Sequence, residues 1–329
     1  MRLLLTAAVL AASLAAASAA EIEAPGPQGP LRGLLAGPAG ADAPVVLMIP
    51  GSGTSDRDGN QLPGIRAATL RLLAEGLAAR GIASARVDKR GLHGSSEAVP
   101  DPEDVTLAAY ADDAHAWIKV LRARTGAPCV WILGHSEGGL VALKTASTRP
   151  EGICGLVLAA TPGRPLGALL REQFRANLPE SPLRQPTLDA LETLLSALEA
   201  GQPADLSNVN PQLAGIFRPS VQPYVIDLLA HDPAKMIAAT DLPVLILQGT
   251  TDLQVTMADA EALAAARPDA RLVRLDGVNH MFKSAPAERT ANLEAYANPD
   301  LPLADGVLEA IAGMVLDDPG TTSRRSPVQ

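Results

Sequence analysis

The chain alternates short, continuous apolar runs with segments of helical spacing. The apolar runs lie at 45–49, 82–87, 130–133, 156–159, 244–247 and 272–275, and helical patterns lie at 67–79, 107–124, 137–147, 257–266 and 305–316. Strands that are apolar throughout are buried on both faces, and their alternation with helices is typical of a parallel sheet covered on both sides. We therefore predict an α/β fold with a doubly wound, mostly parallel sheet.

This alternation stops after Gly163 and resumes near residue 241. Between these points lie helical patterns and proline-rich joints, with one amphipathic helix expected at 188–198. A helical insert within a doubly wound sheet indicates a lid or cap over the sheet. We expect a core at 21–163 and 241–317, an inserted helical cap at 164–240 and a flexible tail at 318–329. Residues 21–43 are rich in Pro, Gly and Ala and are expected to form one weak edge strand.

Residues 1–20 have the pattern of a signal peptide. Arg2 provides the positive charge, residues 3–14 form an apolar stretch, and the small residues at 17–20 offer a cleavage site. An uncleaved membrane anchor is the alternative, but the stretch is alanine-rich and near the lower length limit for a span. We expect an exported protein, periplasmic or secreted. Cys129 and Cys154, at the starts of two neighbouring strands, are then expected either to form a disulfide or to remain buried thiols.

Composition excludes several classes of partner. The net charge is −9 and no cluster of Lys and Arg interrupts the acidic balance, so nucleic-acid binding has no electrostatic footprint. Aromatic residues make up only 2% of the chain, which argues against stacking platforms for sugars or single-stranded nucleic acids. A small-molecule substrate is the expected partner, without a stable membrane span once the signal peptide is removed. The oligomeric state stays open.

The residues from Gly134 to Gly138 read Gly-His-Ser-Glu-Gly and fit the pattern Gly-x-Ser-x-Gly. They follow an apolar strand and open a helix, which is the context of a nucleophile elbow. Ser136 is thus the candidate nucleophile. The backbone N–H of Glu137 lies at the helix N-terminus, where it can stabilise a developing oxyanion. The alternative is a glycine-rich packing turn.

A serine nucleophile needs a base, and the chain has five histidines: His93, His115, His135, His231 and His280. His280 follows the last predicted strand, so its loop lies at the carboxyl edge where α/β sites are built. His115 falls within a predicted helix and His231 within the cap. The side chain of His135 is expected to leave the elbow in another direction. We therefore select His280 as the base.

An orienting carboxylate is expected on the loop after the strand at 244–247, which places Asp252 at the same edge. The order Ser136, Asp252, His280 is that of the α/β-hydrolases. Asp276 is the rival acid, but it is better explained as a turn residue before Gly277. Asp259 is expected to be solvated on the following helix.

A second oxyanion donor is expected from the loop at 50–60, where small residues allow close approach to a substrate carbonyl. We select the N–H of Ser52, with Gly53 as the alternative. Asp56, Arg57 and Asp58 of this loop are expected to form a local ion pair that shapes it, in preference to binding substrate.

The motifs together resemble the α/β-hydrolase superfamily, in its esterase and serine-aminopeptidase-like branch of serine hydrolases. They are Pro50-Gly51-Ser52-Gly53, Asp56-Arg57-Asp58-Gly59-Asn60, Asp88-Lys89-Arg90-Gly91, Gly134-His135-Ser136-Glu137-Gly138-Gly139, Gly249-Thr250-Thr251-Asp252 and Asn279-His280. The resemblance runs over most of residues 44–316 and implies a triad of Ser136, Asp252 and His280, with catalysis that uses no metal or cofactor. His93 stands where such relatives often carry glycine, and a solvated loop histidine is the default reading.

We predict a hydrolase that cleaves carboxylic esters through an acyl-enzyme. A peptidase or an acyltransferase with the same triad is the alternative, and a non-catalytic binding module is a second one. The cap residues Leu169, Leu170, Phe174 and Phe217 are candidates for contact with an acyl group, with packing onto the core as their other explanation. The physiological substrate and the preferred acyl length stay open.

Overall fold

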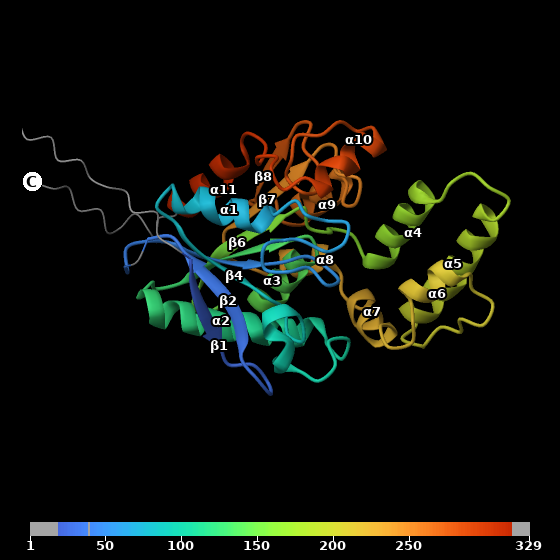
Figure 1. The fold of residues 1–329 in the computed structure, drawn as a ribbon, viewed down its shortest axis with the longest axis horizontal. Coiled ribbons are helices and arrows are strands. Elements are labelled where there is room, and N and C mark those ends of the chain that lie inside the picture. The colour runs from blue at the N-terminus through green and yellow to red at the C-terminus, as the bar shows by residue number, and fades with distance from the viewer. Residues whose placement is uncertain (1–18, 39, 318–329) are drawn as a thin grey trace, which may run out of the picture.

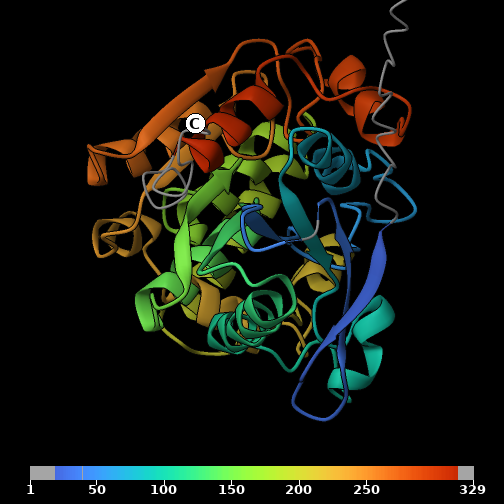
Figure 2. The same cartoon turned by 90° about the vertical axis from the view of Figure 1, so that its left-hand side faces the viewer.

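The computed structural model describes residues 19–38 and 40–317 of the chain. Their centre is one eight-stranded sheet with the order β1-β2-β4-β3-β5-β6-β7-β8, shown in Figures 1 and 2. The strands are β1 (Ala20–Ala24), β2 (Leu31–Ala36), β3 (Val45–Ile49), β4 (Ala83–Val87), β5 (Val130–His135), β6 (Ile153–Ala159), β7 (Val244–Gly249) and β8 (Arg271–Leu275).

The six strands from β4 to β8 in this order run parallel, as the uninterrupted apolar runs predicted. Leu47 at the centre of β3 pairs with Ala85 of β4 and with Ile132 of β5, and all three side chains are buried. Their burial on both faces explains why these strands lack polar alternation. The doubly wound, mostly parallel sheet is confirmed.

Helices cover both faces of the sheet. The helices α2 (Leu107–Thr125), α3 (Glu137–Thr148) and α9 (Met257–Ala266) pack on one face, and α1 (Thr69–Ala78) and α11 (Val307–Leu316) pack on the other. Figure 1 shows α1 and α11 across the sheet from α2. Because each face contributes its own apolar cluster, the strand ends are held rigidly, and the loops that leave them have fixed starting points.

The N-terminal region differs from its prediction. It forms two strands, β1 and β2, that pair antiparallel as a hairpin, and β2 joins the sheet antiparallel to β4. The prediction of a single weak edge strand in this region was therefore wrong, because the region forms two strands.

Of the predicted signal peptide 1–20, residues 1–18 lie outside the described residues, and Ala20 begins β1. The predicted tail at 318–329 also lies outside them.

Five helices separate β6 from β7: α4 (Leu166–Asn177), α5 (Arg184–Glu199), α6 (Pro211–Ile216), α7 (Gln222–Leu229) and α8 (Pro233–Ala238). Figure 1 shows α4, α5 and α6 gathered on one side of the sheet. They bury a cluster of their own, formed by Leu191, Leu194, Leu195, Leu198, Leu213 and Phe217. We call α4 to α7 the cap helices. The remaining short helices are η1 (His93–Ala98), α10 (Arg289–Glu294) and η2 (Ala295–Ala297).

Cys129 and Cys154 form a disulfide, with their Cα atoms 5.2 Å apart. Cys129 immediately precedes β5 and Cys154 lies at the start of β6, so the bond ties two adjacent central strands at their amino ends. In the described part of the chain, every helix is too short or too polar to cross a bilayer.

Candidate active site

The turn between β5 and α3 holds Ser136 in a strained conformation, with φ 55° and ψ −123°. Its glycines have no room for a side chain. A Cβ on Gly134 would lie 2.1 Å from the carbonyl oxygen of Gly138, and one on Gly138 would lie 2.3 Å from that of Ile49. Such a crossing of strand and helix lifts the serine clear of the sheet. Ser136 is half-buried, and its hydroxyl donates to no other described residue.

Asp252 and His280 are brought together at the carboxyl edge of the sheet. Nδ1 of His280 donates to Oδ2 of Asp252 at 2.7 Å, and both side chains are almost fully buried. The other carboxylate oxygen accepts from the backbone N–H groups of Gln254 and Val255, at 2.8 and 3.0 Å. Gln248 adds a bond to Oδ2 at 3.0 Å. The carboxylate is thus fixed, and by engaging Nδ1 it favours the tautomer in which Nε2 of the neutral imidazole is the acceptor.

His135 connects the elbow to the loop that carries His280. Its Nε2–H donates to the backbone carbonyl of His280 at 2.9 Å, and the two rings lie 4.9 Å apart. Burial, and secondarily the neighbouring His280, lower the pKa of His135 to about 4. The ring is therefore neutral near pH 7 and acts as a donor. Through this bond the residue just before Ser136 holds the His280 loop in place.

The loop after β3 approaches the elbow closely. A Cβ on Gly51 would lie 3.3 Å from Cβ of Ser136, so glycine allows the contact. Ser52 follows it and is exposed, and its N–H donates to no described residue. Glu137 is the first residue of α3, where N–H groups have no acceptor within the helix. Ser52, Ser136 and Glu137 line one cavity, so these two N–H groups are the candidate oxyanion donors. Gly53 takes a positive φ of 65° and faces Gln61.

A cavity of about 220 Å³ lies between the elbow and the cap helices. Its walls are mostly apolar, and they are formed by Ser52, Ser136, Glu137, Leu140, Pro162, Leu166, Leu169, Leu170, Gln173, Ile216, Phe217, Val225, Leu228, Gln254 and Val255. Three of the four predicted cap residues, Leu169, Leu170 and Phe217, line it. Phe174 does not, because it packs within the cap, with its ring 6.3 Å from that of Phe217.

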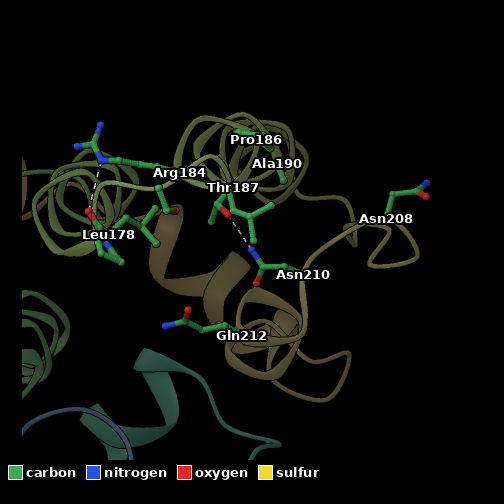
Figure 3. Close-up of a pocket in the computed structure, with 11 residues that line it drawn as sticks. Leu178, Arg184, Pro186, Thr187, Ala190, Asn208, Asn210 and Gln212 are labelled. Carbon is green, nitrogen blue, oxygen red and sulfur yellow. Dashed lines mark hydrogen bonds between the residues drawn. The ribbon is translucent and has the colours of Figure 1, made fainter.

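A second cavity, of about 320 Å³, lies within the cap away from the elbow. Figure 3 shows Arg184, Thr187 and Asn210 on its walls. The guanidinium of Arg184 already donates to the backbone carbonyls of Leu178 and Arg175. None of the candidate catalytic side chains contributes to this cavity. Elsewhere in the described ranges, no cluster of three or more His, Cys, Asp or Glu is suited to a metal ion.

Three residues that the sequence analysis rejected as catalytic candidates are Asp276, His93 and Asp259. Asp276 is exposed and precedes Gly277 in a turn. His93 is an exposed residue whose Nε2–H donates to the carbonyl of Thr54 at 2.8 Å. Asp259 was expected to be solvated, and that was wrong. It is fully buried in the first turn of α9, where Arg164 donates to both of its carboxylate oxygens.

The charged residues of the loop at 50–60 pair with other segments, not with one another. Arg57 binds Asp88, with Nη2 2.5 Å from Oδ2, and Asp58 pairs with Arg86. Asp56 accepts the N–H groups of Asp58 and Asn60. The expected local ion pair was therefore wrong in its partners, because β4 lies beside β3 and presents its own charges to this loop.

Several site residues escaped the sequence analysis. Gln173 and Gln254 face the cavity, and Gln248 supports Asp252. Lys89 lies buried beneath the loop of Ser52 and contacts Glu137. Their sequence patterns carry no signal of these roles, except that Lys89 belongs to one of the motifs quoted above.

Comparison with known proteins places this geometry in context. A family model described as "Serine aminopeptidase, S33" matches residues 66–284. Esterase EstD of Thermotoga maritima is 28% identical over 253 residues, which are 75% of this chain but 56% of that protein. The chain thus spans little more than half the length of this curated relative.

Solved structures share the fold at low sequence identity. A proline iminopeptidase of Mycobacterium smegmatis superposes with a TM-score of 0.55 at 20% identity, over 80% of this chain and 92% of that one. Est1E of Butyrivibrio proteoclasticus gives 0.55 at 18% identity, over 91% and 98%. These likenesses show a common fold.

Proposed function

Because the chain belongs to the serine aminopeptidase family of hydrolases, we propose that it cleaves carboxylic esters through an acyl-enzyme. The observation that carries the proposal is the buried 2.7 Å hydrogen bond between Asp252 and His280, on a loop held to the residue before Ser136. A carboxylate that fixes the tautomer of an imidazole base beside a serine is the arrangement used to activate that serine.

In the proposed reaction, Oγ of Ser136 attacks the ester carbonyl carbon while Nε2 of His280 takes its proton. The carbonyl π electrons move to oxygen, which accepts from the N–H groups of Ser52 and Glu137. Collapse of this intermediate breaks the ester C–O bond, and His280 returns the proton to the departing alcohol. Water, deprotonated by His280, then hydrolyses the acyl-Ser136 bond. Asp252 orients the imidazole and stabilises the imidazolium in both steps.

The cavity supports an ester with an uncharged acyl group. An aminopeptidase substrate carries an ammonium next to the scissile bond, and its recognition calls for a free carboxylate. The carboxylate on this cavity wall, that of Glu137, already faces Lys89 at 3.6 Å. The rest of the wall is apolar apart from serines and glutamines. A volume of about 220 Å³ is below the roughly 300–1,000 Å³ of drug-sized sites, which favours short acyl chains.

The proposal is tested with a fluorophosphonate probe, a series of p-nitrophenyl esters from acetate to decanoate, and a set of aminoacyl anilides. We expect labelling of the wild type, turnover of the short esters and little turnover of the anilides. Ser136→Ala is the matched control, since alanine fits the turn and lacks only the hydroxyl. Anilide cleavage that exceeds ester cleavage would identify a peptidase, and turnover that survives in Ser136→Ala would refute the nucleophile.

A further inference from the structure

Lys89 is a buried charged residue beneath the elbow that the proposed reaction leaves without a task. It follows β4 in the Asp88-Lys89-Arg90-Gly91 motif, and its side chain is 5% exposed. Burying an ammonium is costly unless it is paired and hydrogen-bonded. Its contacts therefore indicate what it does.

Nζ of Lys89 donates to the backbone carbonyl oxygen of Gly51 at 2.8 Å. That carbonyl belongs to the same peptide group as the N–H of Ser52. The bond between Gly51 and Ser52 is trans, so its C=O and N–H point in opposite directions. A donor that fixes the carbonyl on the buried side thus fixes the N–H of Ser52 on the opposite side.

The same ammonium reaches the second half of the candidate oxyanion hole. Nζ of Lys89 lies 3.6 Å from Oε1 of Glu137, the residue whose backbone N–H is the other donor. The ring of Tyr110 closes the cluster, with its centroid 5.6 Å from Nζ. One side chain therefore contacts the peptide group that carries the first candidate donor and the side chain of the residue that carries the second.

We propose that Lys89 is a positioning residue that aligns the N–H of Ser52 with that of Glu137 for binding the oxyanion. This inference rests on the proposed function. A hydrogen bond to the carbonyl of a peptide also polarises its N–H, which strengthens the donor. Burial lowers the pKa of the Lys89 ammonium and Glu137 opposes that shift. Both the ammonium and the neutral amine carry N–H groups, so the contact with Gly51 survives either way.

The rival explanation is that Lys89 only neutralises the buried carboxylate of Glu137. The double variant Lys89→Met/Glu137→Gln separates the two, because it removes both charges and keeps the backbone N–H of residue 137. Replacing a buried ion pair as a whole is often tolerated, whereas removing one partner is not. If Lys89 only neutralises the charge of Glu137, the double variant should keep the wild-type turnover.

We expect the folded double variant to lose about 10- to 100-fold in kcat on p-nitrophenyl butyrate, with KM changed less than about threefold, as for a weakened oxyanion donor. The Ki for a short-chain trifluoromethyl ketone, which forms an oxyanion on binding, rises by the same factor. Lys89→Leu/Glu137→Gln is a second neutral pair should the first not fold.

The matched control is Arg90→Met/Asp113→Asn. It removes a neighbouring ion pair, in which Arg90 donates to Asp113 at 2.6 and 2.7 Å, and it leaves the hydrogen bond from Lys89 to Gly51 in place. Its kcat stays near the wild-type value. A neutral Lys89 pair with wild-type kcat and Ki would overturn this inference alone. A wild type that neither hydrolyses the esters nor binds the ketone would overturn the proposed function and the inference with it.

Discussion

Asp252 holds the imidazole of His280 by a 2.7 Å hydrogen bond, although 28 positions of the chain separate the two residues. Asp252 lies on the loop after β7 and His280 on the loop after β8. Because β7 and β8 are parallel neighbours, both loops leave the sheet at the same edge. The relative placement of base and acid is thus a consequence of strand order.

This relationship predicts unequal effects of two matched substitutions. Asp252→Asn should lower kcat by about 10³- to 10⁴-fold, because the amide favours the wrong imidazole tautomer. Asp276→Asn should leave kcat unchanged, since Asp276 is exposed in a turn. Steady-state kinetics on p-nitrophenyl butyrate measure both. A crippled Asp276→Asn enzyme beside an active Asp252→Asn enzyme would reverse the assignment of the acid.

The lowered pKa of His135, the residue before Ser136, predicts that the folded protein loses stability in mild acid. Burial lowers the pKa of His135 to about 4 in the folded protein, from 6.5 in the unfolded chain. The unfolded state therefore binds the proton first as the pH falls. The stability linked to His135 is complete above pH 6.5 and is lost progressively toward pH 4. Between pH 7.5 and 5 the loss amounts to about 2 kcal/mol.

Urea unfolding at these two pH values tests this. His135→Gln keeps a donor for the carbonyl of His280 but does not titrate, so it should lose less stability than the wild type between pH 7.5 and 5. His93→Asn removes an exposed histidine and should behave as the wild type does. Equal pH dependence in all three proteins would show that His135 titrates normally.

Local patterns predicted the parts of this site that local geometry determines. The elbow around Ser136 was predictable because its glycines are required by the close contacts between β5, α3 and the end of β3. The hydrogen bonds of His135 and Lys89 were not, because each is made to a backbone carbonyl of a different segment. The burial of Asp259 was not predicted for a similar reason, since its partner Arg164 lies 95 residues away in the sequence.

The N-terminal edge of the sheet and the cap were also only partly predictable from local sequence patterns. The hairpin of β1 and β2 is short and glycine- and proline-rich, so its pairing is decided by the free edge of β4 and not by its own pattern. The apolar residues of α4 were equally suited to the cavity and to the cap's own cluster. Leu170 contributes to the cavity wall and Phe174 only to the cluster, and a helical pattern alone does not distinguish two apolar faces.

The N-terminal sequence predicts export with cleavage after Ala19 or Ala20. The full chain, expressed in a bacterium with a periplasm, should yield a mature protein that begins at Ala20 or Glu21, as read by intact-mass spectrometry of the periplasmic fraction. Leu10→Arg interrupts the apolar stretch and should keep the unprocessed chain in the cytoplasm. Thr6→Ser is the conservative control. An intact Met1 on exported wild-type protein would indicate an uncleaved anchor.

The cavity between the elbow and the cap helices should set the preferred acyl length. Leu170 lies on α4 and faces this cavity, so Leu170→Trp reduces its volume and Leu170→Ala enlarges it. We expect the ratio of kcat/KM for p-nitrophenyl octanoate to that for the acetate to fall about 10- to 100-fold in Leu170→Trp, because each methylene in an apolar pocket contributes roughly 1–3 kcal/mol. In Leu170→Ala the ratio should rise.

Ala168→Leu, on the exposed side of the same helix, is the control and should leave this ratio of kcat/KM values unchanged. Labelling by a small fluorophosphonate should stay the same in all three variants, since Ser136, Asp252 and His280 lie on the core. Variants that lose labelling while their acyl preference is retained would show that α4 supports the catalytic residues and does not bind the acyl chain.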